Sequence, residues 1–460
     1  MFIKQIYTAC LAQASYYIES KGEAVVIDPI REPTPYLELA ASRNARIKYV
    51  FETHFHADFV SGHIDLSKLT GAPIIFGPGA ETGYPISNAE DGQSFTLGDV
   101  TLQLKHTPGH TLESSCYLLY NEDGKEHAIF TGDTLFVGDV GRPDLLDGIA
   151  TKEELASHLY NSLNKVIKPL PDDVIVYPAH GPGSSCGKTI GPQTWSTIGD
   201  QKKSNYALQQ MSESEFVKTV TSDLKAPPPY FFIDASINKN GYEEVAEVLK
   251  RTVTPLPPDT FRAHIESGAV VLDTRKAEDF EKGFVQGAIN IGLNGMYAIW
   301  VGTLIDHETP LLIIADAGKE EESISRLARV GYEQVLGYLE GGFQAWKDQG
   351  LISDTISSIS AAELAKRTSI SHILDVRKEE EYNDVHLDHA LNIPLASLEE
   401  QLGRVDDKDS FFIHCATGYR SMTAASLLKR NGISNFINIS GGMESISRTD
   451  IKLTLRKNLP

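Results

Sequence analysis

The stretch Thr53-His54-Phe55-His56-Ala57-Asp58-Phe59 carries the strongest signal in this chain of 460 residues. It follows an apolar run at residues 47–51, which predicts a buried strand. Loops at strand ends are where a rigid scaffold presents functional side chains. Two imidazoles and a carboxylate at alternating positions in such a loop can converge on a volume the size of a metal ion. The stretch therefore predicts a metal site.

Three further segments also place histidine or aspartate at the end of an apolar run. They lie at residues 105–111, 129–134 and 174–181, and they contain His110, Asp133 and His180. A single histidine is ordinarily a surface or core residue, but four such segments in this order predict one shared site. The surrounding short apolar strands and glycine turns predict a β-rich first half, with a helix at residues 155–168.

In order, spacing and flanking residues, these segments resemble the metallo-β-lactamase fold, and specifically its persulfide dioxygenase branch, over roughly the first half of the chain. The resemblance implies an αββα domain with one Fe(II) per chain, held by His54, His110 and Asp133. The chemistry agrees, because two imidazoles and one carboxylate form a facial triad that leaves positions open for a persulfide and for O2.

Phe59 is where the chain departs from a familiar pattern. Hydrolases of this fold carry H-x-H-x-D-H, and Phe59 replaces the last histidine. The substitution removes a ligand usually needed for a second metal, which indicates one-metal chemistry. His56, Asp58 and His180 match second-metal positions, and we expect them to orient ligands and water by hydrogen bonds. A purely structural role for these three is the alternative.

Two more residues are candidates through the resemblance. Arg142, in the segment 141–144, is expected to hold its loop or to contact an anionic group of the substrate, with a plain salt bridge as the alternative. Tyr177 is expected near the site. His63 and His106 are interpreted as structural.

The second half of the chain contains a degenerate repeat with a period of about 100 residues, the size of a small domain. Residues 270–275 match residues 372–377, and a second apolar strand follows each, at 311–315 and 411–414. Strands that alternate with helical segments predict α/β domains with parallel sheets.

Proline-rich clusters at residues 226–229 and 254–258 suit connectors, because proline fixes φ and removes a hydrogen-bond donor. We therefore place the domains at residues 1–250, 255–352 and 356–460.

Cys415 follows the strand at 411–414 and precedes a short loop and a helix that begins near Ser421. Loop amides and a helix N-terminus stabilise a thiolate or an anionic sulfur. With its flanking segments, this motif resembles a rhodanese (sulfurtransferase) domain. The resemblance implies that Cys415 is the persulfide-carrying nucleophile. It also implies an anion-binding loop, formed by Ala416, Thr417, Gly418, Tyr419 and Arg420.

The first copy of the repeat lacks this thiol. Asp316 is expected at the nucleophile's place, and a carboxylate cannot carry a persulfide. The first copy therefore resembles an inactive rhodanese domain with a structural or docking role.

The chain has four cysteines, widely spaced, which excludes a disulfide framework and favours a reducing compartment. Cys186 lies in a loop of small residues shortly after His180, and we expect that loop to be exposed and flexible. A sulfur relay at Cys186 is possible beside the alternative of an ordinary loop cysteine. Cys10 and Cys116 are interpreted as packing residues in strands.

Charge and targeting signals limit the partners. The net charge of -20, from 42 basic and 62 acidic residues, disfavours nucleic acid. Neither a signal peptide nor a transmembrane run is recognised, which predicts a cytoplasmic protein without a membrane partner. A homo-oligomer is expected from the resemblance alone.

These features together predict a persulfide dioxygenase and sulfurtransferase in sulfide detoxification. O2 would oxidise the terminal sulfur of a small thiol persulfide, and Cys415 would exchange sulfane sulfur with thiosulfate or sulfite. The direction of transfer and the thiol (glutathione, coenzyme A, cysteine or bacillithiol) stay open. One alternative is a two-zinc thioester hydrolase of the glyoxalase II type with a fused rhodanese. Another is a sulfur carrier or sensor without enzymatic activity.

Overall fold

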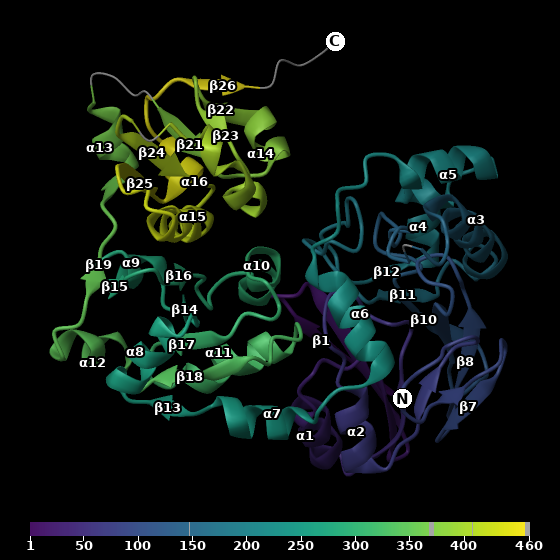
Figure 1. Cartoon of the computed structure of the whole chain (residues 1–460). Coiled ribbons are helices and arrows are strands. Elements are labelled where there is room, and N and C mark those ends of the chain that lie inside the picture. The colour runs from purple at the N-terminus through teal and green to yellow at the C-terminus, as the bar shows by residue number, and fades with distance from the viewer. Residues whose placement is uncertain (147, 368–371, 407, 456–460) are drawn as a thin grey trace. The chain divides into compact units, whose positions relative to one another are not determined.

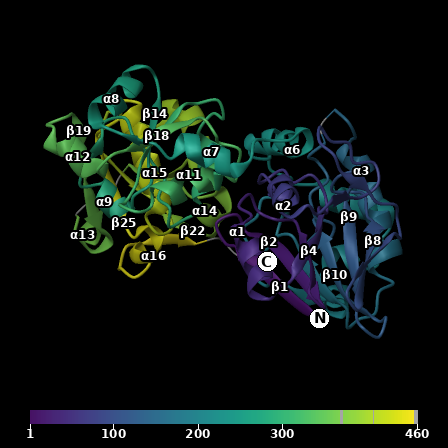
Figure 2. The same ribbon diagram turned by 90° about the horizontal axis from the view of Figure 1, so that it is seen from below.

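The computed structural model describes residues 1–146, 148–367, 372–406 and 408–455. Its contacts divide these residues into two compact units. Unit 1 takes its residues from 1–248 and 328–331, and unit 2 from 249–327 and 332–460. Figure 1 and Figure 2 show the elements of each unit in two views.

Unit 1 is built on two six-stranded sheets. The first contains β1 (Phe2–Thr8), β2 (Gln13–Ser20), β3 (Glu23–Ile27), β4 (Arg46–Phe51), β5 (Ile74–Phe76) and β6 (Ser87–Asn88), in that order. The second contains β7 (Ser94–Leu97), β8 (Val100–His106), β9 (Ser115–Tyr120), β10 (Glu126–Gly132), β11 (Ile175–Pro178) and β12 (Ser196–Thr197), also in that order from one edge to the other. Strands β3 to β6 are parallel, and so are β10 and β11. The predicted strand at residues 47–51 is confirmed as β4.

Helices cover the outer faces of both sheets. They are α1 (Thr34–Ser42), α2 (His63–Thr70), α3 (Lys152–Ser162), α4 (Ile198–Ser204) and α5 (Glu213–Thr221), with a π-helical turn at Leu163–Ile167 and a 3-10 turn at Tyr206–Leu208. The helices α6 (Tyr230–Asn240) and α7 (Val245–Thr252) follow, and the boundary between the two units falls within α7. The predicted helix at 155–168 therefore begins earlier, at Lys152, where Thr151 and Glu154 form a capping box. Its last turn is π-helical.

Three apolar clusters show the order of the layers in unit 1. One joins the first sheet to α1 and α2 through Tyr36 and Leu66. The second fills the space between the sheets and includes Phe51 and Phe130. The third joins the second sheet to α3 and α5 through residues such as Phe216. This order of helices, two sheets and helices confirms the expected αββα fold.

Unit 2 contains two five-stranded sheets, both entirely parallel, which confirms the predicted α/β architecture. The first sheet has the order β13-β18-β17-β14-β16, and the second has the order β20-β25-β24-β21-β23. The pairs β15 with β19 and β22 with β26 lie outside these sheets.

The elements around the first sheet are β13 (Pro255–Leu256), α8 (Pro258–Glu266), β14 (Val270–Asp273), α9 (Ala277–Phe280), β15 (Phe284–Val285), β16 (Ile289–Asn290), α10 (Tyr297–Leu304), β17 (Leu311–Ile314), α11 (Glu320–Ala328), β18 (Val335–Leu339), α12 (Gly342–Asp348) and β19 (Ser353–Asp354). Those around the second sheet are β20 (Ser358–Ser360), α13 (Ala361–Ala365), β21 (Ile373–Asp375), α14 (Glu379–Asp384), β22 (Val385–Leu387), β23 (Leu391–Asn392), β24 (Phe411–His414), α15 (Tyr419–Arg430), β25 (Phe436–Ser440), α16 (Gly442–Ile446) and β26 (Leu453–Leu455), with 3-10 turns at Leu395–Ser397 and Glu399–Arg404.

The internal repeat is visible in matching buried contacts. In the first copy Arg275 binds the Asp273 carboxylate through two nitrogens, and Asn290 Nδ2 donates to the carbonyl oxygens of both residues. The second copy repeats each of these contacts with Arg377, Asp375 and Asn392. Within the part of the chain that the structure describes, none of the helices combines the length and apolarity needed to cross a bilayer.

Candidate functional site

The predicted metal-site residues of unit 1 lie in loops that follow strands of both sheets. His54 follows β4, His110 follows β8, Asp133 follows β10 and His180 follows β11. All four side chains are buried. The structure therefore brings together residues that are far apart in the sequence.

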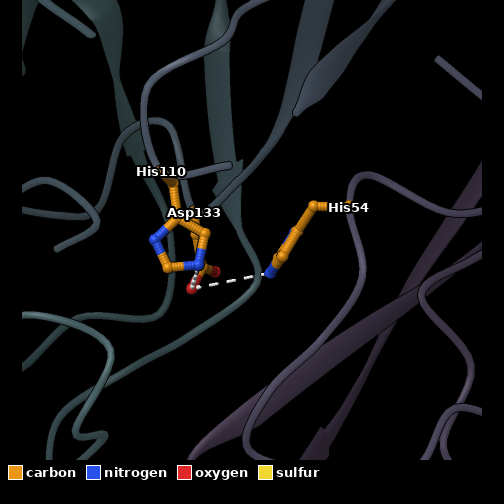
Figure 3. Close-up of side chains that lie close together, drawn as sticks. All are labelled: His54, His110 and Asp133. Carbon is orange, nitrogen blue, oxygen red and sulfur yellow. Dashed lines mark ion pairs between the residues drawn. The ribbon is translucent and has the colours of Figure 1, made fainter. Parts of the chain in front are cut away.

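His54, His110 and Asp133 form one cluster, and Figure 3 shows both imidazoles pointing at the carboxylate. Nε2 of His54 lies 3.8 Å from Asp133 Oδ2, and Nε2 of His110 lies 3.4 Å from the same oxygen. Neither oxygen of Asp133 has a hydrogen-bond partner among the described residues. Buried polar atoms without partners are costly, so this arrangement fits a bound cation.

Hydrogen bonds on the far side of each ring leave Nε2 free for a metal. Nδ1 of His110 lies 2.8 Å from the Arg142 carbonyl oxygen, which only accepts, so Nδ1 carries the proton. For His54 the partner is Thr53, whose Oγ1 lies 2.9 Å from Nδ1 and donates to Asp28 Oδ2 at 2.9 Å. That hydroxyl therefore accepts from His54, and the Nε2 lone pairs of both rings face Asp133.

Gly132 explains how the loops of the two sheets come so close. Its φ is +51°, and a Cβ there would lie 2.5 Å from Thr53 Oγ1. Only glycine accepts both the left-handed backbone and this contact. The loop that carries Asp133 can therefore approach the loop that carries His54.

His56, Asp58 and His180 form a second buried cluster, as their second-metal resemblance predicts. His180 Nε2 lies 3.5 Å from Asp58 Oδ2 and 3.5 Å from Asp133 Oδ1, so the two clusters adjoin. Nε2 of His56 faces Asp28 Oδ1 at 3.2 Å and Glu52 Oε2 at 3.4 Å. Burial alone lowers the pKa of His56, but the charge and hydrogen bonding of these carboxylates raise it well above its usual value.

Phe59 is fully buried, and its ring centroid lies 4.4 Å from that of His56. The position where the resemblance to H-x-H-x-D-H leads one to expect a histidine is thus occupied by a packed aromatic ring.

The side chains of Arg142 and Tyr177 contact other residues of the protein. Arg142 binds Asp144 through two nitrogens, at 2.7 and 2.8 Å, and also donates to the Ser185 carbonyl oxygen. Its guanidinium therefore holds two loops together beside the metal cluster. The Tyr177 ring stacks on Phe130 between the sheets. Contact of either residue with a substrate stays a prediction.

Cys186 corrects one expectation. Its loop was expected to be exposed, yet Cys186 is only 1% exposed and adjoins Asp133 and His180. The Arg142 amide donates to the Cys186 carbonyl oxygen at 2.9 Å, which holds the loop inward. Burial and the nearby charges of Asp58 and Asp133 raise the pKa of its thiol well above the usual range. The sulfur relay stays a prediction, and it now has a position beside the metal cluster.

Three residues around the site were missed by the sequence analysis. Asp28 and Glu52 directly follow apolar strands, the same signal that identified His54 and Asp133, and they support Thr53 and His56. Asp234 of α6 is buried, and both of its oxygens lack partners among the described residues. Burial and the neighbouring charge of Asp58 raise its pKa well above the usual value. No local pattern points to it.

The thiol site lies at the end of β24 in unit 2. Cys415 is 1% exposed, and the Gly418 amide donates to its Sγ at 3.1 Å. The following helix, α15, begins at Tyr419, slightly before the predicted start. Arg420 is bound by Glu381 at 2.6 and 2.7 Å, so the one cation of the loop is already paired.

Strand register corrects the position of Asp316. Asp273 pairs with Ile314 in the first sheet, and Asp375 pairs with His414 in the second. Ala315, and not Asp316, therefore stands where Cys415 stands in the second copy. The first copy still lacks a thiol at that place.

The other two cysteines differ from one another. Cys116 is buried in β9 as predicted. Cys10 lies in a turn after β1, half-buried, and not in a strand.

Comparison with family models agrees with these two sites. Residues 8–180 match the metallo-beta-lactamase superfamily. Residues 257–349 and 360–449 each match the rhodanese-like domain. We call these two segments the first and second rhodanese-like domains.

Relatives of two activities match unit 1. The chain is 34% identical over 236 residues to the persulfide dioxygenase ETHE1, mitochondrial, of Homo sapiens, which covers 50% of this chain and 84% of that protein. It is 32% identical over 183 residues to the cytoplasmic hydroxyacylglutathione hydrolase of Arabidopsis thaliana, which covers 39% of this chain and 67% of the hydrolase. The chain also matches a probable hydroxyacylglutathione hydrolase of Schizosaccharomyces pombe, and it spans 60% of the length of that protein.

A solved structure extends the likeness to most of the chain. The crystal structure of a metallo-beta-lactamase from Staphylococcus aureus subsp. aureus COL superposes with a TM-score of 0.66 at 31% identity. The match covers 74% of this chain and 99% of that one.

Proposed function

We propose that this chain, which belongs to the metallo-beta-lactamase superfamily and carries two rhodanese-like domains, is a persulfide dioxygenase with sulfurtransferase activity. The observation that carries the proposal is the cluster of His54, His110 and Asp133, with both imidazole Nε2 lone pairs facing one carboxylate. The similarity to the human persulfide dioxygenase supports it.

The residues fit one Fe(II), which would supply redox chemistry with O2 at its open positions. In the net reaction, R–S–SH, O2 and H2O give R–SH, sulfite and two protons. The outer sulfur loses four electrons, and O2 gains them. His54 and His110 present Nε2 towards the ion because Thr53 and the Arg142 carbonyl oxygen hold their Nδ1 protons. Burial first, and then the neighbouring histidines, lower the pKa of His54 well below its usual value.

In the second rhodanese-like domain, Cys415 would accept or donate the sulfane sulfur that thiosulfate and sulfite exchange. The Gly418 amide supports an anionic sulfur at that place. Cys186, buried beside Asp133, is proposed as a secondary sulfur acceptor near the metal. The direction of transfer, a homo-oligomeric state and a cytoplasmic location stay predictions.

A two-zinc thioester hydrolase of the glyoxalase II type is the second candidate. The second cluster, His56, Asp58 and His180, favours it. One observation counts against it: Phe59 replaces a histidine and packs on the His56 ring.

Metal content and oxygen uptake distinguish the two candidates. The protein is purified anaerobically, its iron and zinc are quantified, and O2 uptake is followed with several thiol persulfides. We expect one iron per chain and one O2 consumed per sulfite formed. Two zincs per chain, with thioester cleavage and no O2 uptake, would refute the proposal.

A further inference from the structure

A cavity of about 140 Å³ lies between the two rhodanese-like domains of unit 2. Its walls include Glu278, Glu281 and Asn294 of the first domain, and Gly418, Tyr419 and Asn438 of the second. At about 30 Å³ for each water, it has room for a group of about four or five water volumes. The cavity is therefore large enough for the polar end of a small molecule.

Contacts between the domains fix the shape of this cavity. The Tyr419 hydroxyl donates to the Gly292 carbonyl oxygen at 2.7 Å, and a Cβ at Gly295 would lie 2.5 Å from the Tyr419 ring. The backbone N–H of Asn290 donates to Ser426 Oγ at 3.0 Å, which joins β16 to α15. Figure 1 shows these two elements side by side. The first domain, which has Ala315 where Cys415 stands in the second, thus forms a wall beside the thiol site.

Gly418 connects the cavity to the thiol. It lines the cavity, and its amide donates to Cys415 Sγ at 3.1 Å. A molecule whose polar end occupies the cavity therefore needs a chain of only a few atoms to reach the sulfur of Cys415.

The cavity is acidic. Glu278 and Glu281 are its charged residues, and none of the described residues that line it is basic. Arg420, the cation of the Cys415 loop, is not among them and is bound by Glu381. A carboxylate, sulfonate or phosphate in this space would be repelled, and a cation attracted.

The side chain of Asn438 is held in one orientation. Ser358 Oγ donates its proton to Glu281 Oε2. Ser358 Oγ can therefore only accept a hydrogen bond from Asn438, so the atom 3.1 Å away from it is the donor Nδ2. Oδ1 of Asn438 is left without a partner among the described residues, although the residue is only 2% exposed. Asn438 lines the cavity, but this oxygen is closed off from it, so the carboxylates of Glu278 and Glu281 are the charged acceptors that a ligand meets.

We propose that this cavity binds the ammonium group of the small thiol that exchanges sulfane sulfur with Cys415. The inference rests on the sulfurtransferase activity proposed above. An ammonium group has three N–H donors and no acceptor, which suits a cavity with two carboxylates in its wall. Thiols with a primary ammonium group, such as cysteine, are thereby favoured as partners of Cys415. Coenzyme A, which has phosphates and no ammonium group, is disfavoured.

The transfer step balances without a redox partner. The thiolate of the bound thiol attacks the outer sulfur of the Cys415 persulfide. A bond forms between the two sulfurs, the bond from Cys415 Sγ to the outer sulfur breaks, and Sγ leaves as a thiolate. The total charge and the number of electrons are unchanged.

The test uses the full-length protein with thiosulfate as donor and three probe thiols as acceptors. 2-Aminoethanethiol carries an ammonium group, 2-mercaptoethanol is neutral and 3-mercaptopropionate is an anion. Acceptor-dependent kcat/KM is measured for each, at matched thiolate concentration. We expect wild type to prefer 2-aminoethanethiol over 3-mercaptopropionate by at least tenfold. Glu278→Gln combined with Glu281→Gln should abolish most of this preference, and Glu278→Lys should reverse it.

Glu308→Gln is the matched control, because Glu308 is 84% exposed and lies outside the cavity wall. It should keep the wild-type preference. A preference that survives both cavity variants, or that wild type never shows, would overturn the inference. A burst of sulfite from thiosulfate without acceptor reports the loading of Cys415 separately. Absence of that burst in wild type would instead contradict the proposed sulfurtransferase activity.

Discussion

The Phe59 ring packs on the His56 ring at a centroid distance of 4.4 Å. Nε2 of His56 faces Asp28 and Glu52. The substitution of this one ligand acts against a second metal, whereas Nδ1 of His56 has no partner among the described residues.

Replacing Phe59 by histidine should therefore raise the zinc content from one towards two ions per chain. The added imidazole would join Asp58, His180 and Asp133, which already lie close together. Metal analysis after equilibration with zinc measures this. Phe59→Leu removes the ring without adding a ligand and should leave the stoichiometry at one. An unchanged stoichiometry in Phe59→His would show that Phe59 does not limit the site.

Thr53→Val should weaken metal binding by about 10- to 100-fold, the usual effect of removing a hydrogen bond behind a metal-binding histidine. The Thr53 hydroxyl connects His54 Nδ1 to Asp28, and valine keeps its shape without the oxygen. Competition with a metal chelator measures the affinity. Thr96→Val, at an exposed position of β7, serves as control. Equal affinities for the two variants would exclude a role for the hydroxyl.

Gly132→Ala should destabilise unit 1. Alanine at φ +51° costs about 1–2 kcal/mol, and the contact with Thr53 should add about 1–3 kcal/mol. Gly124 has φ +73°, and a Cβ added there would meet nothing within 4 Å, so Gly124→Ala isolates the backbone cost. Urea unfolding followed by aromatic fluorescence gives both free energies. Equal losses in the two variants would mean that the loops adjust at no cost.

Glu381→Gln should change how the stability of unit 2 depends on pH. Burial alone raises the pKa of Glu381, but Arg420 outweighs it and the net pKa is lowered. A carboxyl with a lowered pKa in the folded state stabilises the fold above its unfolded pKa, about 4.3. That contribution is lost as pH falls through the folded value. Wild type should therefore be more stable than the variant at pH 7, and the difference should shrink below about pH 4. Urea unfolding at several pH values measures it, and a difference independent of pH would contradict the pairing.

The two activities should separate by substitution. His110→Ala removes a ligand of the first cluster, so iron content and O2 uptake should be lost while thiosulfate sulfurtransfer survives. Cys415→Ser should do the reverse, because serine cannot carry a persulfide. Oxygen-electrode and sulfite assays on both variants test this. Sulfurtransfer that persists in Cys415→Ser would show that another thiol carries the sulfur.

Several features could be predicted because they follow from short-range patterns. Apolar runs that end in His54, Asp133 or Cys415 predicted strands followed by functional loops, and the structure has β4, β10 and β24 at these places. The matching runs at 270–275 and 372–377 predicted two parallel α/β domains, which both sheets confirm. Alternation and run length are local properties, so a single sequence reveals them.

The tertiary structure alone decided which side chains meet. Cys186 itself is buried and its carbonyl oxygen accepts from the Arg142 amide, although Pro182, Gly183, Lys188 and Thr189 of the same loop are exposed as predicted. Asp28 and Glu52 directly follow apolar strands, but only the packed loops bring them to face His56. Strand pairing moved the position equivalent to Cys415 from Asp316 to Ala315. The sequence by itself determined the domain types and the candidate ligands, since these depend on residue type and local spacing. Burial, hydrogen-bond partners and the acidic cavity beside Cys415 depend on contacts between distant segments, which exist only once the sheets and domains have packed.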